Sequence, residues 1–99
     1  MTMTASGVAK LIEECGELTQ ILGKKLAYWH TDTHPDGAGL ISQRIEDEMG
    51  DVLAAIYFTR NQLKLDRNRI NDRAILKQNL FESWEAAVGN NDDAIDGWL

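Results

Sequence analysis

The segment at 30–39, HTDTHPDGAG, separates two stretches of helical periodicity and therefore decides how the chain folds. It contains Pro35, the single proline of the chain, and it is the one place where turn-forming residues cluster. We expect a loop here. Because apolar residues recur at helical spacing on both sides, this loop should join two consecutive helices.

Three helices are predicted around and after this loop. From about Ala5 to Trp29 the spacing is that of an amphipathic helix, marked by Val8, Leu11, Ile12, Cys15, Leu18, Leu22 and Leu26. A second helix is marked by Ile41, Ile45, Met49, Val52, Leu53, Ile56 and Phe58. Asp66 is a typical N-cap for a third helix that ends before Gly89, marked by Ile70, Ala74, Lys77, Phe81, Trp84 and Val88.

The predicted fold class is all-α, with an antiparallel helical hairpin and a third helix packed across it. Leu11, Leu18 and Ile21 lie outside the main apolar stripe of the first helix, so much of its circumference needs cover. A chain of 99 residues buries only about two-thirds of its unfolded surface. We therefore expect oligomerisation to complete a four-helix-bundle-like core. Residues 1–89 should form a single domain, followed by an acidic tail at 90–99.

Composition excludes several classes of protein. Ten basic against 16 acidic side chains give a net charge of −6, which opposes binding to a nucleic acid polymer. No apolar stretch is long enough to span a membrane, and the start MTMTASGVAK lacks a secretory signal, so we expect a cytoplasmic protein. The single cysteine, Cys15, cannot form an internal disulfide, and any metal must be held by oxygen or imidazole.

Two pairs of acids interrupt the apolar arcs of the first two helices. Glu14 falls between Leu18 and Ile21 on the helical wheel, and Glu17 follows three residues later. Glu48 and Asp51 repeat this arrangement on the second helix. In an antiparallel hairpin the first pair lies roughly 18 Å back from the loop and the second roughly 13 Å beyond it, at 1.5 Å per residue. The two pairs should lie nearly level.

Four converging carboxylates would repel one another unless a cation lay among them. Oxygen ligands alone favour a hard cation, so Mg²⁺ is the expected cofactor and Mn²⁺ the alternative. The competing interpretation is that these acids are solvated helix faces paired with Lys10, Lys24 or Arg44. Two pairs at matching depth favour the metal site.

The motifs EECGE at 13–17 and EMGD at 48–51, the latter followed by VLAAIYF, resemble those of the MazG-like nucleotide pyrophosphohydrolases, an all-α superfamily of NTP pyrophosphatases. The resemblance implies a homodimer or homotetramer that uses magnesium to split a nucleoside triphosphate into a monophosphate and pyrophosphate. By motif position, the metal ligands would be Glu14, Glu17, Glu48 and Asp51. Glu13 would be the candidate for activating the attacking water.

Further candidates for substrate contacts are Lys24, Lys25, Lys77 and Trp29. The lysines could meet phosphate and Trp29 could stack on a base, although helix-dipole complementarity and packing explain the same residues. Two other functions stay open. One is a non-catalytic carboxylate metal-binding bundle, and the other is a helical module whose apolar faces only dimerise.

Overall fold

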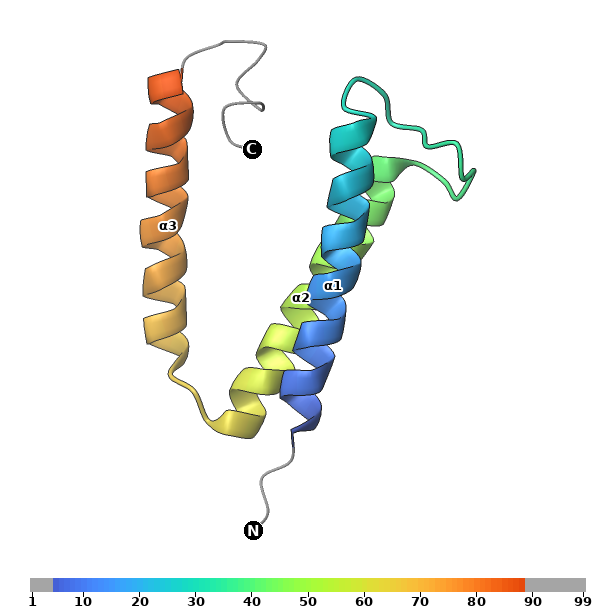
Figure 1. Ribbon diagram of the computed structural model, residues 1–99. Helices are drawn as coiled ribbons and strands as arrows, with labels where there is room; N and C mark the ends of the chain where they lie inside the picture. The colour runs from blue at the N-terminus through green and yellow to red at the C-terminus, as the bar shows by residue number, and fades with distance from the viewer. Residues whose placement is uncertain (1–4, 89–99) are drawn as a thin grey trace. The chain divides into compact units, whose positions relative to one another are not determined.

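The computed structural model describes residues 5–88, and the described part is entirely helical apart from loops. Helix α1 spans Ser6–Ala27, α2 spans Ile41–Leu63 and α3 spans Arg67–Val88 (Figure 1). The predicted all-α class and three helices are thereby confirmed. The predicted tail at 90–99 lies outside the described residues. None of the described helices combines the length and apolar character needed to cross a membrane.

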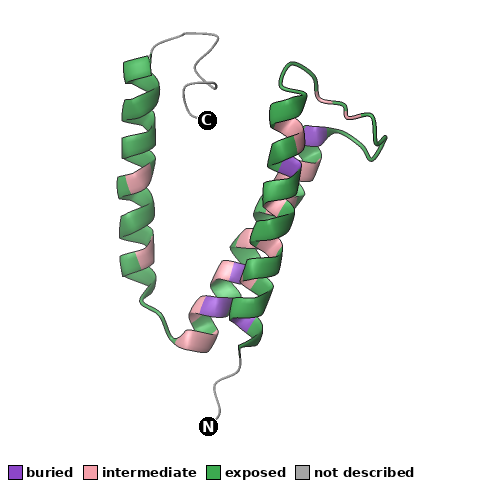
Figure 2. Cartoon of the chain, viewed as in Figure 1, coloured by how far each residue is buried: buried purple, intermediate pink, exposed green. Residues whose placement is uncertain are grey.

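The chain divides into two units, Met1–Leu65 and Asp66–Leu99. In the first unit, α1 and α2 lie side by side and antiparallel, joined by the loop that contains Pro35 (Figure 1). Its buried residues follow the line along which the two helices meet (Figure 2). In the second unit, α3 begins after Asp66, whose carboxylate Oδ1 accepts the backbone N–H of Arg69 at 3.1 Å. The predicted N-cap is therefore confirmed.

The contact between α1 and α2 follows the alternating four-and-three spacing of a heptad seam. On α1 the buried or half-buried seam residues are Gly7, Leu11, Glu14, Leu18 and Ile21. On α2 they are Ile41, Ile45, Glu48, Val52, Ala55 and Thr59. Glu14 and Glu48, two of the four predicted metal ligands, thus occupy seam positions that would normally hold apolar side chains.

The seam differs from the apolar stripe predicted for the first helix. Five members of that stripe are exposed within the described residues: Val8, Ile12, Cys15, Leu22 and Leu26. Cys15, which was expected to be a core residue, is among them. Val8, Ile12, Cys15 and Leu22 each follow a seam position by one residue, as do the exposed Met49 and Leu53 on α2. In an antiparallel pair such positions turn to the same face, so the hairpin carries one apolar face.

The opposite face of the hairpin is mainly polar, although Ala54 and Phe58 of α2 also lie on it. It is formed by the residues that precede each seam position, which on α1 include Lys10, Glu13, Glu17 and Gln20. On α2 they include Arg44, Asp47 and Asp51. The acidic pairs of the sequence therefore open onto the polar side of the hairpin, away from the exposed apolar stripes.

A close backbone contact fixes the end of the hairpin remote from the loop. The backbone N–H of Gly7, which has no partner within its own first helical turn, donates to Gln62 Oε1 at 2.7 Å. Thr59 Oγ1 lies 2.8 Å from the carbonyl oxygen of Gly7. A Cβ atom at position 7 would come within 3.0 Å of Thr59 Cα. The register of the two helices therefore requires glycine at this position.

The loop end is fixed by Asp32, which caps α2 from a distance in sequence. Its carbonyl oxygen accepts the backbone N–H of Ile41 at 2.8 Å, and its Oδ1 accepts the backbone N–H of Ser42 at 2.8 Å. The hydrogen bonds from Ser42 lower the pKa of Asp32. With both ends of the hairpin fixed, the acids midway along the two helices come to the same level.

Candidate metal centre

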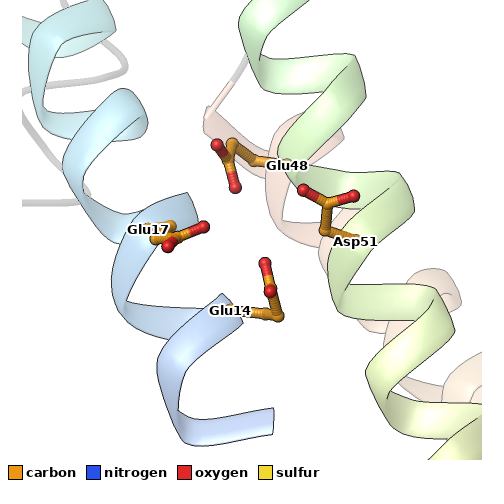
Figure 3. A group of neighbouring side chains, drawn as sticks. All are labelled: Glu14, Glu17, Glu48 and Asp51. Carbon is orange, nitrogen blue, oxygen red and sulfur yellow. The ribbon is translucent and has the colours of Figure 1, made fainter. Parts of the chain in front are cut away.

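Four carboxylates converge between α1 and α2, as their spacing in the sequence predicts. Glu14 and Glu17 project from α1, and Glu48 and Asp51 project from α2, toward a common point (Figure 3). One oxygen of each of the four residues lies within 4.8 Å of those of the other three. The three-residue spacing within each pair places one acid in the seam and the other on the polar flank.

Glu14 and Glu48 are the inner pair. The Oε2 atom of each is buried and has no hydrogen-bond partner among the residues that the structure describes. A buried carboxylate oxygen normally has a donor, because its desolvation otherwise destabilises the fold. The two unsatisfied oxygens therefore point to a ligand that supplies positive charge.

The electrostatics of the inner pair agree with this conclusion. Desolvation raises the pKa of Glu14, and the negative charges of Glu17 and Asp51 raise it further. The pKa of Glu48 is raised by the same causes in the same order. In the absence of a cation, both residues hold a proton more tightly than an isolated glutamate does.

The four residues fit a small divalent cation. All the donors are carboxylate oxygens, which suit hard cations such as Mg²⁺ and Mn²⁺. Opposite ligands of Mg²⁺ lie about 4.2 Å apart, twice the Mg–O distance of about 2.1 Å. The observed spread of 4.8 Å is close to this separation, so the four carboxylates lie near enough to one another to share a single ion.

A family model of the MazG nucleotide pyrophosphohydrolase domain matches residues 3–79, which include all four carboxylates. The chain belongs to the MazG family. No match was found among curated proteins, and none among solved structures. Membership in the MazG family indicates nucleotide pyrophosphohydrolase activity and a nucleotide substrate, and this family generally depends on a divalent cation.

A groove runs from the acidic cluster of this MazG domain toward the loop. It has a volume of about 390 Å³. Its lining residues are Glu17, Gln20, Ile21, Lys24, Arg44, Asp47 and Glu48. Two of the four carboxylates thus share a groove with two cationic side chains, Lys24 and Arg44. Both cations bind Asp36 of the loop, Lys24 Nζ at 2.9 Å and Arg44 Nη1 at 3.1 Å.

A second groove opens on the other side of the cluster. It has a volume of about 340 Å³. Its lining residues are Lys10, Glu14, Asp51, Ala54, Ala55 and Phe58. Here the carboxylates adjoin apolar side chains and one aromatic ring instead of paired cations. The acidic cluster therefore lies between a charged groove and a more apolar one.

The predicted base and the predicted substrate contacts of the first unit lie outside the four-carboxylate cluster. Glu13 is exposed on the polar face, and its Oε2 accepts a hydrogen bond from Lys10 Nζ at 3.2 Å, which raises the pKa of Lys10. Lys25 Nζ donates to the carbonyl oxygen of Thr31 at 3.1 Å and lies 5.5 Å from the ring centre of the exposed Trp29. Among the predicted contacts on the hairpin, Lys24 alone lines the charged groove.

Lys77 belongs to the other unit, on α3. Its Nζ lies 5.9 Å from the ring centre of Phe81. The side chain is half-buried, in keeping with its place at an otherwise apolar spacing. Its role as a substrate contact stays a prediction.

Arg44 and Asp36 were missed as site residues. The sequence suggests Arg44 only as an ion-pair partner for the acids of the helices, but its guanidinium binds Asp36 of the loop. One available signal was that Arg44 lies one helical turn before Glu48 and so faces the same side of α2. The pairing of Asp36 with Lys24, across 12 residues, depends on the conformation of the loop and has no periodic signal.

Proposed function

We propose that the protein hydrolyses nucleoside triphosphates, deoxynucleoside or modified ones in particular, to nucleoside monophosphates and pyrophosphate with Mg²⁺ as cofactor. The observation that carries this proposal is the convergence of four carboxylates, two with unsatisfied buried oxygens, in a MazG domain. The assignment to a pyrophosphohydrolase explains why two costly buried acids lie in a helical seam.

In this proposal Glu14, Glu17, Glu48 and Asp51 hold the cation, with Mn²⁺ as an alternative to Mg²⁺. A bound divalent cation neutralises phosphate charge and polarises the phosphoryl oxygens. The protein contributes the position of the substrate and the orientation of the water. Glu13, one helical turn before Glu17 on the same polar face, is the proposed base that accepts a proton from that water.

Four residues are proposed as substrate contacts. Lys24 lines the charged groove next to Glu17 and Glu48, where it can meet phosphate oxygens. Lys25 and Trp29 lie together at the loop end of α1, where the indole ring can stack on a base. Lys77, on α3, is proposed as a further phosphate contact. The geometry supports Lys24 most directly.

We also propose that residues 1–89 form one domain, followed by a separate tail at 90–99, and that the protein is a homodimer or homotetramer. The exposed apolar face of the hairpin supports self-association, because Ile12, Leu22, Met49 and Leu53 lie on one side of it. A second hairpin on this face would complete a four-helix bundle and leave the polar face open to substrate. The cytoplasm, which holds nucleoside triphosphates, is the proposed compartment.

Product analysis tests the proposed reaction. The purified protein is incubated with Mg²⁺ and a panel of canonical and modified nucleoside triphosphates, and the products are identified. Equimolar monophosphate and pyrophosphate are expected from at least one substrate, with no reaction in excess chelator. Release of orthophosphate alone would contradict the reaction. No turnover of any triphosphate, with metal binding intact, would favour the non-catalytic metal-binding bundle.

A further inference from the structure

Asp36 binds both cations of the charged groove at once. Its Oδ2 accepts a hydrogen bond from Lys24 Nζ at 2.9 Å and one from Arg44 Nη2 at 3.2 Å. Its Oδ1 accepts one from Arg44 Nη1 at 3.1 Å, so the guanidinium holds the carboxylate in a two-pronged pair. Arginine and lysine hold phosphate groups through the same donors. The carboxylate therefore occupies a place suited to a phosphate.

Lys24 and Arg44 lie in the same groove as two acids of the four-carboxylate cluster. Lys24 and Arg44 are the cationic members of a groove whose other end is formed by Glu17 and Glu48. A polyphosphate held through a cation at the carboxylates carries more negative charge than that cation neutralises. Along this groove the excess charge can be met by Lys24 and Arg44. Asp36 then competes with it directly.

The carboxylate of Asp36 can separate from Lys24 and Arg44 while the hairpin stays folded. The start of α2 is held by Asp32, whose bonds to Ile41 and Ser42 do not involve Asp36. The turn around Asp36 is closed by its own bonds: His34 Nδ1 accepts the backbone N–H of Asp36, and Asp36 Oδ1 accepts that of Ala38. Gly37 and Gly39, both with positive φ, follow within three residues of Asp36 and give the backbone there conformational freedom.

We propose that Asp36 is an internal competitor for the polyphosphate of the substrate, and that binding displaces it from Lys24 and Arg44. This inference rests on the proposed function in one respect, namely that the protein binds a polyphosphate. The loop between α1 and α2 thus acts as a latch on the two cations of the charged groove, closed by Asp36 and opened by phosphate. Arg44, which was not among the predicted contacts, becomes a phosphate-binding residue together with Lys24.

Pyrophosphate is the probe, because it contains the proposed ligand chemistry and needs no turnover. Its dissociation constant is measured by calorimetry with millimolar Mg²⁺ at pH 7 for the wild type, Asp36→Asn and Asp47→Asn. Asparagine keeps the acceptor for the Ala38 N–H but removes the charge. Asp47 lines the same groove and forms no ion pair with any residue that the structure describes, so Asp47→Asn is the matched control for lost negative charge.

Asp36→Asn should bind pyrophosphate about three- to tenfold more tightly than the wild type, because the competing ion pairs are gone. Asp47→Asn should show a clearly smaller gain in affinity for pyrophosphate. The double variant Lys24→Gln/Arg44→Gln should bind pyrophosphate more weakly than the wild type. Adding Asp36→Asn to this double variant should not increase its affinity for pyrophosphate. An equal gain in the two single variants, a gain that persists without the cations, or no binding of pyrophosphate to any of the proteins would overturn the proposal.

Nuclear magnetic resonance of the wild type supplies a readout that does not depend on how the variants fold. Saturating pyrophosphate should shift the side-chain resonances of Asp36 and Arg44 and the amide resonances of residues 34–38. The amide of Ser42, held by Asp32, should stay in place. Bound pyrophosphate with an unchanged Asp36 resonance would contradict the latch. The hydrolysis assay is separate, so an inactive protein that still shows this pattern would refute the proposed function alone.

Discussion

Glu14 of α1 and Glu48 of α2 each bring a buried, unsatisfied Oε2 atom into the seam between the two helices. One carboxylate oxygen of each lies within 4.8 Å of the other and of an oxygen of Glu17 and of Asp51. In a heptad seam the same two positions would ordinarily hold apolar side chains that stabilise the hairpin. Two acids therefore make the middle of the seam less stable than apolar side chains would, and we expect a bound cation to offset this loss.

Glu13→Gln tests the proposed base. If Glu13 accepts a proton from the attacking water, turnover should fall about 10²- to 10⁴-fold, because an amide cannot act as a base. The stabilisation by Mg²⁺ should stay as in the wild type, since Glu13 lies outside the four-carboxylate cluster. Steady-state kinetics and thermal melting measure the two effects. Wild-type turnover would remove Glu13 from the mechanism.

Gly7→Ala tests the close contact at the end of the hairpin. The added Cβ would come within 2.5 Å of Gln62 Oε1 and 3.0 Å of Thr59 Cα. The amide of Gln62 can turn away but the backbone of Thr59 cannot, so we expect a loss of about 1–3 kcal/mol in the free energy of unfolding. Gly23→Ala is the control. It meets no atom within 4 Å and should gain about 0.5–1 kcal/mol. Urea unfolding measures the free energy of unfolding of both variants. Equal stabilities of Gly7→Ala and Gly23→Ala would argue against the close contact between Gly7 and Thr59.

The ion pairs of Asp36 predict a pH dependence of stability. The hydrogen bond from Lys24 is the main cause that holds the pKa of Asp36 well below its usual value of 3.8, and the Ala38 N–H and Arg44 contribute. The folded state therefore gives up this proton more readily than the unfolded chain. The carboxylate stabilises the fold above pH 3.8, and its contribution is lost as the pH falls from there through the lowered pKa.

Melting temperatures of the wild type and Asp36→Asn between pH 7 and pH 3 measure this dependence. The wild type should melt higher at neutral pH, and the difference should narrow below about pH 4. Asp47→Asn should follow the wild type throughout. A constant difference between the wild type and Asp36→Asn over the whole range would mean that the charge of Asp36 does not stabilise the loop.

Leu53→Glu tests the proposed self-association. Leu53 is 50% exposed on the apolar face of the hairpin, so a charge there should weaken an interface on this face by at least about tenfold in dissociation constant. Gln43→Glu adds the same charge to an exposed site outside the apolar stripe. Light scattering should show a dimer or tetramer for the wild type and Gln43→Glu. A stable monomeric wild type at micromolar concentration would refute the oligomer.

The helices and the acidic cluster could be predicted because both follow from the 3.6-residue period. Glu14 and Glu48 stand within apolar arcs, and level positions in a hairpin follow from the rise per residue and the place of the loop. The sequence could not identify which apolar stripe of α1 faces α2. Two adjacent stripes are apolar, and the true seam contains Gly7 and Glu14, which do not look like seam residues.

The charged groove could not be predicted for a different reason. Lys24 and Arg44 both bind Asp36, and this arrangement depends on the path of the loop between α1 and α2, in which two glycines have positive φ. No periodic pattern encodes such a path. Asp32 is a similar case, because it caps a helix that begins nine residues later.

The metal response of Glu48→Gln tests the central claim most directly. In the wild type, a cation at about 100 times its dissociation constant should add about 2.7 kcal/mol, or of the order of 10 °C in melting temperature for a domain of this size. Glu48→Gln removes one proposed ligand and should bind Mg²⁺ more than about tenfold more weakly. Without metal it should melt at or above the wild-type temperature, because desolvation and the charges of Glu17 and Asp51 disfavour the Glu48 carboxylate.

The decisive measurement is the shift in melting temperature between chelator and millimolar Mg²⁺ for the wild type, Glu48→Gln and the control Glu46→Gln, an exposed glutamate on the same helix and outside the cluster. The account predicts a large shift for the wild type and Glu46→Gln and little or none for Glu48→Gln. A wild-type shift in Glu48→Gln, or no shift in the wild type, would contradict the four-carboxylate metal centre.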